Sequence, residues 1–252
     1  MSRRHLVSAV VLFALLVLPD ARAAAADDIA VLCSNGLKAV LEDLGPKFES
    51  ATHNKLVVTY GLAASLGQRI RNGEAFDVAF LTPAVVDDLI AAGRISRETR
   101  AQVARSGLAL AIRSGARKPD VSTSDAFKRT LLNAKSIAYA KEGASGVLFA
   151  ATIQRLGIAG DLQSKSRLTA TGEAVSDAVV KGEVELGVLP LSEILPVKGE
   201  EPVVFPADVQ SYIVMVGGAN AASKHAEAAR DLIKYVTAPA ALPVLKAKGM
   251  ER

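Results

Sequence analysis

Short runs of small and polar residues follow several apolar stretches of this chain, and such residues hold anions in proteins. The first run, Ser34-Asn35-Gly36, ends the apolar stretch Ile29–Cys33. Small residues let backbone N–H groups approach a ligand closely, and a helix that begins there directs its positive end toward a negative charge. These runs therefore predict a binding site for a small anion.

The candidate ligand-binding residues lie at the ends of predicted strands or at the starts of predicted helices. They are Ser34, Asn35, Gly36, Ala63, Ala64, Ser65, Thr82, Ser145, Gly146 and Leu189. A similar run, Thr171-Gly172, precedes a further predicted helix. The alternative is simple helix capping, for which serine, asparagine and glycine are also preferred, and for any single run this is the stronger interpretation. Several such runs together favour an anion-binding cleft.

The residues do not single out a catalytic group. Glu142, Glu173 and Glu193 lie near the predicted loops and could act as general bases, although loop carboxylates are more often simply solvated. His53 and His225 stand in polar turn sequences, which favours surface positions over metal binding. The sequence has no phosphate-binding loop, no Gly-x-Ser-x-Gly motif and no cysteine–histidine cluster. We expect no cofactor and no metal.

The first residues have the order of a secretory leader. Arg3 and Arg4 precede the apolar stretch Leu6–Leu18, and the small residues Ala21-Arg22-Ala23 follow it. This order predicts a signal peptide over residues 1–23, cleaved near Ala23, and hence a periplasmic protein. The alternative, an uncleaved membrane anchor, is disfavoured because the apolar stretch is short for a membrane span.

Composition excludes some classes of protein. The net charge is +4, and the leader supplies part of it, so the exported chain is only weakly basic. Aromatic residues make up 4% of the chain and no basic stripe is present, which argues against nucleic-acid binding. The single cysteine, Cys33, cannot form an internal disulfide and is interpreted as a buried structural thiol rather than a nucleophile.

Apolar runs alternate with helical periodicity along the whole chain, which predicts parallel sheets covered by helices. The predicted strands are Ile29–Ser34, Leu56–Tyr60, Asp77–Leu81, Leu108–Ile112, Ser136–Ala140, Val184–Leu189 and Tyr212–Val216. The predicted helices are Leu37–Phe48, Ala63–Arg71, Pro83–Ala92, Ser124–Ala134, Gly146–Leu156, Glu173–Val180, Ala226–Val236 and Pro239–Lys246. Ligands of such folds bind beyond the carboxyl ends of the strands, where the candidate runs lie.

Two extended stretches, Gly107–Ser114 and Val203–Val216, are interpreted as segments that cross between two lobes. The expected architecture is therefore a two-lobed α/β fold with an inter-lobe cleft. Lobe 1 comprises residues 27–108 plus 206–252, and lobe 2 comprises residues 109–205. On the second crossing segment, Gln210 and Tyr212 could supply neutral hydrogen bonds, although Tyr212 is equally consistent with the core.

The stretch from Leu37 to Thr82, LKAVLEDLGPKFESATHNKLVVTYGLAASLGQRIRNGEAFDVAFLT, resembles the opening of the periplasmic molybdate-binding proteins of ABC importers. RLGIAG and HAEAARDLIKYVTAPAALPVLKAKGM are similar to later parts of the same family. The resemblance covers essentially the whole exported chain. It implies the periplasmic binding protein type II fold, whose lobes close about a hinge on a small anion. We expect a monomer whose partner is an ABC permease.

The chain departs from this family at its ligand-binding loops. The family's first-loop serine falls on Gly36, with Ser34 displaced by two positions. At the second loop, Ser65 stands where the family has alanine, and the family's late tyrosine falls on Pro190. Ala144-Ser145-Gly146 still offers backbone N–H groups at the third loop. The ligand therefore stays open between a molybdate-like oxyanion and a small carboxylate.

A second resemblance concerns ARKPDVSTSDAFKRTLLNAKSIAYAKEGASGV, residues 116–147, which is similar to a branch of the family that includes aconitate isomerase. The chain keeps Ala144-Ser145-Gly146-Val147 but has Leu148 where that branch has tyrosine. The resemblance implies an alternative function, an enzyme that interconverts cis- and trans-aconitate by a 1,3-proton shift. A third alternative is a binding protein that serves a sensor rather than an importer.

Overall fold

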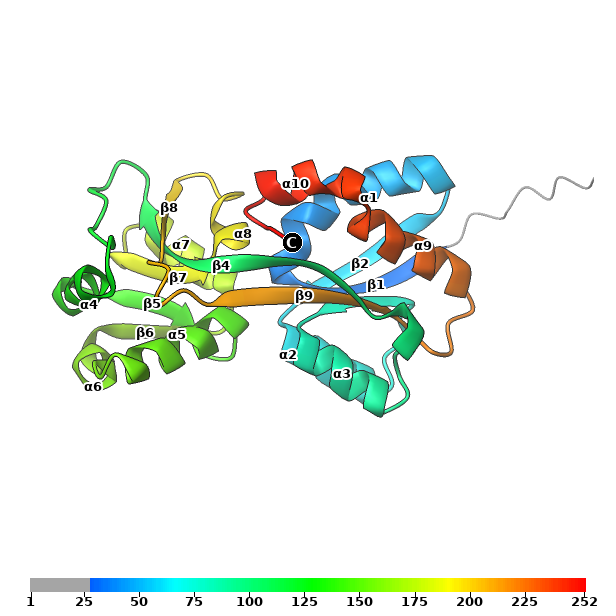
Figure 1. The fold of residues 1–252 in the computed structure, drawn as a ribbon, viewed down its shortest axis with the longest axis horizontal. Helices are drawn as coiled ribbons and strands as arrows, with labels where there is room; N and C mark the ends of the chain where they lie inside the picture. Colours follow the sequence, from blue (N-terminus) through cyan, green and yellow to red (C-terminus); the bar gives the residue numbers. More distant parts are fainter. Residues whose placement is uncertain (1–27) are drawn as a thin grey trace, which may run out of the picture.

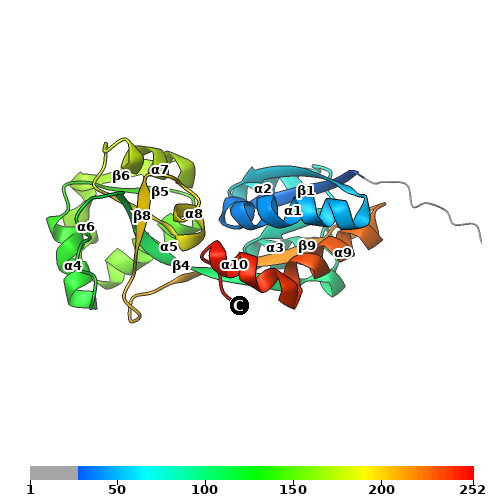
Figure 2. The same cartoon turned by 90° about the horizontal axis from the view of Figure 1, so that it is seen from above.

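The computed structural model describes residues 28–252 and shows an elongated α/β molecule with two lobes (Figures 1 and 2). Strand β4 (Ala101–Arg113) and the segment that leads into β9 (Tyr212–Ala219) pass from one lobe to the other. The predicted signal peptide, residues 1–23, lies outside the described residues. Within residues 28–252, no helix is both long and apolar enough to cross a membrane.

The first lobe contains a sheet in the order β2-β1-β3-β9-β4. Its further strands are β1 (Asp28–Ser34), β2 (Lys55–Gly61) and β3 (Val78–Leu81), which run parallel, whereas β9 is antiparallel to β3 and β4. One face is covered by α1 (Lys38–Thr52), α9 (Ala226–Thr237) and α10 (Leu242–Ala247), and the other by α2 (Ala63–Arg71) and α3 (Pro83–Ala91).

Strand β1 is buried on both faces of this sheet. Val31 and Cys33 belong to the core beneath α1, whereas Leu32 belongs to the core that contains Leu66 of α2. A strand covered on both faces is apolar throughout rather than alternating, which explains the continuous apolar run in the sequence. The strand ends at Ser34, so the residues after it lie at the carboxyl edge of the sheet.

The second lobe is built on the remainder of β4 and on short strands. These are β5 (Ile137–Ala140), β6 (Ser166–Thr169), β7 (Leu186–Pro190) and β8 (Glu200–Val204). Its helices are α4 (Ser124–Asn133), α5 (Ala144–Arg155), α6 (Ala159–Leu162), α7 (Gly172–Val180) and α8 (Leu191–Ile194). The rings of Phe127 and Phe149 pack against Phe205 on one side of the sheet, and Val175 and Val179 of α7 belong to a separate core.

Strand β4 changes its partners in the middle. Gly107 is its last residue paired with β9, opposite Tyr212, and Leu108 is its first residue paired with β7. The Gln210 side chain accepts a hydrogen bond from the Leu108 N–H at 2.8 Å and donates one to the Leu108 carbonyl at 3.1 Å. Gln210 therefore ties the two crossing segments together. The predicted division of the chain remains a prediction about which residues move together. It assigns residues 27–108 plus 206–252 to lobe 1 and residues 109–205 to lobe 2.

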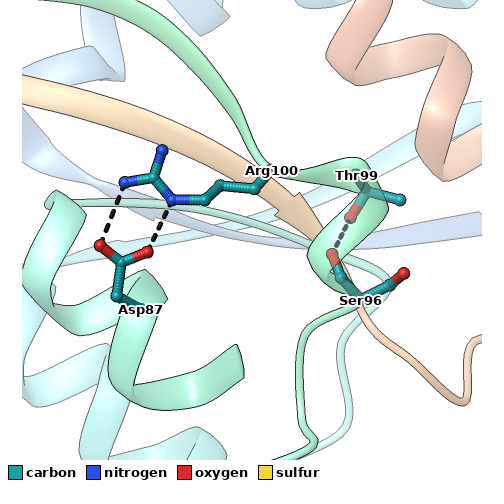
Figure 3. Close-up of polar contacts among 4 residues, drawn as sticks. All are labelled: Asp87, Ser96, Thr99 and Arg100. Carbon is teal, nitrogen blue, oxygen red and sulfur yellow. Dashed lines mark hydrogen bonds and ion pairs between the residues drawn. The ribbon is translucent and has the colours of Figure 1, made fainter. Parts of the chain in front are cut away.

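The start of β4 is anchored to α3 just ahead of the crossing (Figure 3). The Arg100 guanidinium donates to both carboxylate oxygens of Asp87, at 2.6 and 3.1 Å, and lowers the pKa of that carboxyl. Thr99 donates its hydroxyl to the Ser96 carbonyl at 2.8 Å and closes the 3-10 turn before the strand. The ion pair is largely exposed, so its effect is to orient the strand rather than to add much stability.

The predicted elements are present, with several differences at their ends. Helix α5 begins at Ala144, two residues before its predicted start, and α4 begins at Ser124 as predicted, capped by the Thr123 hydroxyl, which accepts from the Ala126 N–H. The stretch Val203–Val216 is not one extended segment, because β8 ends and a turn intervenes before β9. Strands β6 and β8 and helices α6 and α8 were not expected from the sequence, because elements of four or five residues carry too little periodicity.

Cys33 is fully buried and unpaired, which confirms a structural thiol. Burial raises the pKa of the Cys33 thiol above its ordinary range, and Glu42 adds to the rise. We expect a thiol reagent such as DTNB to label the native protein at least ~100-fold more slowly than the urea-unfolded chain, because the thiolate is the reactive form. Stopped-flow absorbance measures both rates, and rapid labelling of the native protein would contradict the buried position.

Candidate functional site

Two adjoining cavities lie between the lobes. The inner cavity holds about 30 Å³ and the outer one about 260 Å³, and both are lined by Asn35, Gly172 and Glu193. Asn35 comes from the first lobe, whereas Gly172 begins α7 and Glu193 lies in α8 of the second lobe. The cavities therefore form one continuous space whose walls belong to both lobes.

Helix starts converge on the inner cavity from both lobes. The lining residues include Ser34-Asn35-Gly36 before α1, Ala63 at the start of α2, Gly143-Ala144-Ser145 at the start of α5 and Gly172 at the start of α7. Parallel strands bring this about, because β1, β2, β5 and β6 all end at the edge that faces the opposite lobe. The positive ends of several helix dipoles thus point into one small space.

Side-chain capping accounts for only one of these runs, Thr171-Gly172. Ser34 is the N-cap of the 3-10 turn Asn35–Leu37 that leads into α1, and it makes no side-chain cap hydrogen bond. The N-cap residues of α2 and α5, Leu62 and Gly143, make none either, whereas Thr171 caps α7 through its hydroxyl. Backbone N–H groups at the starts of α2 and α5 have no capping side chain to satisfy them, which leaves them available to an anion.

Half of the residues expected from the sequence line the inner cavity. They are Ser34, Asn35, Gly36, Ala63 and Ser145. Ala64 and Ser65 are exposed on α2, and Thr82 precedes α3 away from both cavities. Leu189 is fully buried in β7 and belongs to the core beneath α7.

Gly146 lies inside the first turn of α5 and does not line either cavity. It is buried, and a β-carbon there would overlap the carbonyl oxygen of Ala140 at the end of β5. The glycine allows α5 to start directly against the strand end. Its position therefore sets where the neighbouring Ala144 and Ser145 stand relative to the cavity.

Other lining residues were not among the ligand-binding candidates. Among the described residues, Lys38 is the only cationic side chain that lines either cavity. Its Nζ lies 3.1 Å from Glu173 Oε1 of the opposite lobe and 5.6 Å from the centre of the Tyr60 ring. Met215 of β9 approaches so closely that a β-carbon at Gly36 would lie 2.7 Å from its Cε. The one local signal for Lys38 was its position two residues after the run Ser34-Asn35-Gly36.

Glu193 is the carboxyl group common to both cavities. A β-carbon at Gly36 would lie 3.8 Å from its Oε1, and one at Gly172 would overlap its Oε2. Burial raises the pKa of Glu193 to about 7, and the nearby Glu173 adds to the rise. The sequence named this residue only as one of three possible bases. The structure places its carboxylate between the two lobes.

The chain forms two lobes that are joined by crossing strands, and helix starts surround a small cavity between these lobes. This arrangement defines the class of two-lobed periplasmic binding proteins. The model of the family of bacterial extracellular solute-binding proteins matches residues 29–251. The chain belongs to this family.

Comparisons with individual proteins agree with this assignment. The chain is 32% identical over 232 residues to an aconitate isomerase from Pseudomonas sp, a match that covers 88% of this chain and 87% of the relative. The periplasmic molybdate-binding protein of Azotobacter vinelandii superposes with a TM-score of 0.77 at 19% identity, covering 89% of this chain and 99% of that one. The sulfate-binding protein SubI of Mycobacterium tuberculosis H37Rv superposes with a TM-score of 0.76 at 15% identity, covering 89% of this chain and 86% of that one. At these identities the two structures show the fold alone.

Proposed function

We propose that this protein binds a small anion, an oxyanion or a small carboxylate, in the cavity between its lobes. One observation carries the proposal: the starts of helices from both lobes surround the inner cavity, and those of α2 and α5 lack side-chain caps. Backbone N–H groups and helix dipoles at such positions favour negative charge. Lys38 adds a positive charge at the rim.

The same proposal includes a role in transport. A periplasmic solute-binding protein delivers its ligand to an ABC permease, and the family assignment and the predicted leader support this role. We propose export to the periplasm, cleavage near Ala23 and a monomeric protein whose lobes close on the ligand about the crossing segments.

A thermal-melt screen tests the binding proposal. The panel contains molybdate, tungstate, sulfate, citrate, cis-aconitate and trans-aconitate, each added to the purified exported chain. A ligand at ~100 times its dissociation constant adds about 2.7 kcal/mol, which for a protein of this size raises Tm by roughly 5–10 °C. We expect such a shift with at least one of these anions. No shift with any of them would contradict small-anion binding.

A second candidate function is isomerisation of aconitate. The observations that favour it are the 32% identity to an aconitate isomerase over most of both chains and the Glu193 carboxyl in the cavity. A molybdate-like dianion has no proton to donate to a carboxylate, so an ionised Glu193 would repel it. Proton NMR of cis- and trans-aconitate with micromolar protein distinguishes an enzyme, which interconverts them, from a binding protein, which releases each unchanged.

A further inference from the structure

Glu193 has unusual surroundings for a carboxylate. It lies in the short helix α8, and its oxygens are directed into the gap between Gly36 of one lobe and Gly172 of the other. Among residues 28–252, no hydrogen bond to its side chain is formed. The neighbouring residue Ser192 is 4% exposed and lines the outer cavity, and its buried hydroxyl is also without a hydrogen-bond partner in the described chain. Polar groups left unpaired beside a cavity indicate that a ligand completes their hydrogen bonds.

The charged groups that face Glu193 come from two helices. Helix α1 contributes Lys38 and Glu42, and α7 contributes Glu173 and Asp177. From β9 the neighbouring side chain is Met215, which carries no charge. Burial disfavours the ionised form of Glu193 and the nearby Glu173 acts in the same direction, so the pKa of about 7 places both protonation states within reach near neutral pH.

The other carboxylates near the cavity are already engaged or exposed. Glu173 is paired with Lys38 and its side chain is 66% exposed. Asp177 is paired with Lys181 on the outer face of α7, and Glu42 is exposed. Glu142 is exposed in the loop before α5 and lines neither cavity between the lobes. Glu193 is therefore the carboxylate best placed to touch a ligand held by the helix starts.

We propose that Glu193 is the catalytic residue that moves a proton on a bound aconitate, an inference that rests on the proposed binding of a small carboxylate. One Glu193 oxygen takes a proton from the methylene carbon next to a substrate carboxylate, and the electron pair of that C–H bond enters the adjacent carbon–carbon system. The double bond shifts by one position. The proton on Glu193 then passes to the former vinyl carbon, so the carboxylate is restored and no oxidant or reductant is needed.

Deuterium exchange tests this step directly. Each aconitate isomer is incubated with the protein in D₂O, and proton NMR follows the loss of the methylene and vinyl signals. Wild type should exchange these positions, and Glu193→Gln should lower the exchange rate by about 100-fold or more while retaining the wild-type Tm and the Tm shift with aconitate. The matched control is Glu142→Gln, another candidate base from the sequence, which should exchange like wild type.

The pH profile separates a catalytic role from a structural one. A base acts in its ionised form, so kcat/KM should rise with pH and level off above a midpoint near pH 7, set by the pKa of Glu193 of about 7. Glu173→Gln removes a like charge and should move this midpoint to lower pH. A structural defect would lower the rate without moving the midpoint.

The outcomes are distinct. Binding of aconitate in wild type with neither deuterium exchange nor interconversion of the isomers overturns the proton-transfer role and leaves the anion-binding function intact. Exchange at the wild-type rate in Glu193→Gln also overturns it. If neither isomer binds, the hypothesis that the ligand is aconitate is wrong, and this inference is wrong as well. Exchange in wild type and in Glu142→Gln, but not in folded and ligand-binding Glu193→Gln, supports it.

Discussion

A Gly146→Ala variant should be less stable than wild type by about 3 kcal/mol or more, at the upper end of the penalties for overpacking. The added β-carbon would overlap the Ala140 carbonyl oxygen and lie 2.9 Å from the Ala140 carbonyl carbon and 3.3 Å from Tyr139 Cδ2. The first two are backbone atoms at the end of β5, so no side-chain rotation relieves the overlap. Either β5 or the first turn of α5 has to move.

The expected drop in Tm is roughly 6–12 °C for a protein of this size, measured by circular dichroism. Gly160→Ala in α6 is the matched control, because a β-carbon there meets nothing within 4 Å. That variant should be neutral or slightly stabilised, since alanine favours the helix by about 0.5–1 kcal/mol. A Tm for Gly146→Ala within about 2 °C of wild type would show that the close approach of α5 to β5 is wrong.

The expected loss of stability makes Gly146 a poor position at which to test ligand binding. A bulky substitution there is expected to unfold the protein rather than only weaken the ligand, because the side chain would overlap the Ala140 carbonyl oxygen. The adjacent Ser145, which lines the inner cavity, is the informative position on that loop.

Lys38→Met should weaken anion binding by about 10- to 100-fold, the second large effect that we expect. A charge-assisted hydrogen bond to a partly buried anion is worth about 1.5–3 kcal/mol. Lys38 is the one cationic side chain lining either cavity in the described chain, and it reaches Glu173 across the gap between the lobes. Methionine keeps the apolar length of the side chain but removes the charge, and with it the cation–π contact with Tyr60.

Lys47→Met is the control for this measurement. Lys47 lies on the same helix α1, pairs with Asp43 and lines neither cavity. Isothermal titration with trans-aconitate, or with molybdate if the melt screen finds only that anion, gives the dissociation constants of both variants. An unchanged affinity in Lys38→Met would mean that the helix starts alone hold the anion and that Lys38 serves only to join the lobes.

Much of the fold follows from local patterns. The bounds predicted for α2, Ala63–Arg71, match the structure, because a helix of this length presents an apolar face and begins one residue after the glycine that ends β2. The family resemblance and the extended stretch at Gly107 anticipated two lobes with a crossing strand. Half of the candidate residues line the inner cavity, because small residues mark strand ends and helix starts, and these ends face the opposite lobe.

The chemistry of the cleft depends on contacts that no local pattern encodes. Lys38 meets Glu173 across 135 positions of sequence, and the Glu193 carboxylate enters the cavity only because Gly36 and Gly172 leave room for it. Helix α8, which carries Glu193, is too short for periodicity to reveal. Strand order, chain length between elements and side-chain burial together bring these groups to one place. A sequence therefore displays residue types and their spacing, whereas the tertiary packing of the two lobes decides which carboxylate lines the cavity, which cation lies near it and which backbone groups stay free for an anion.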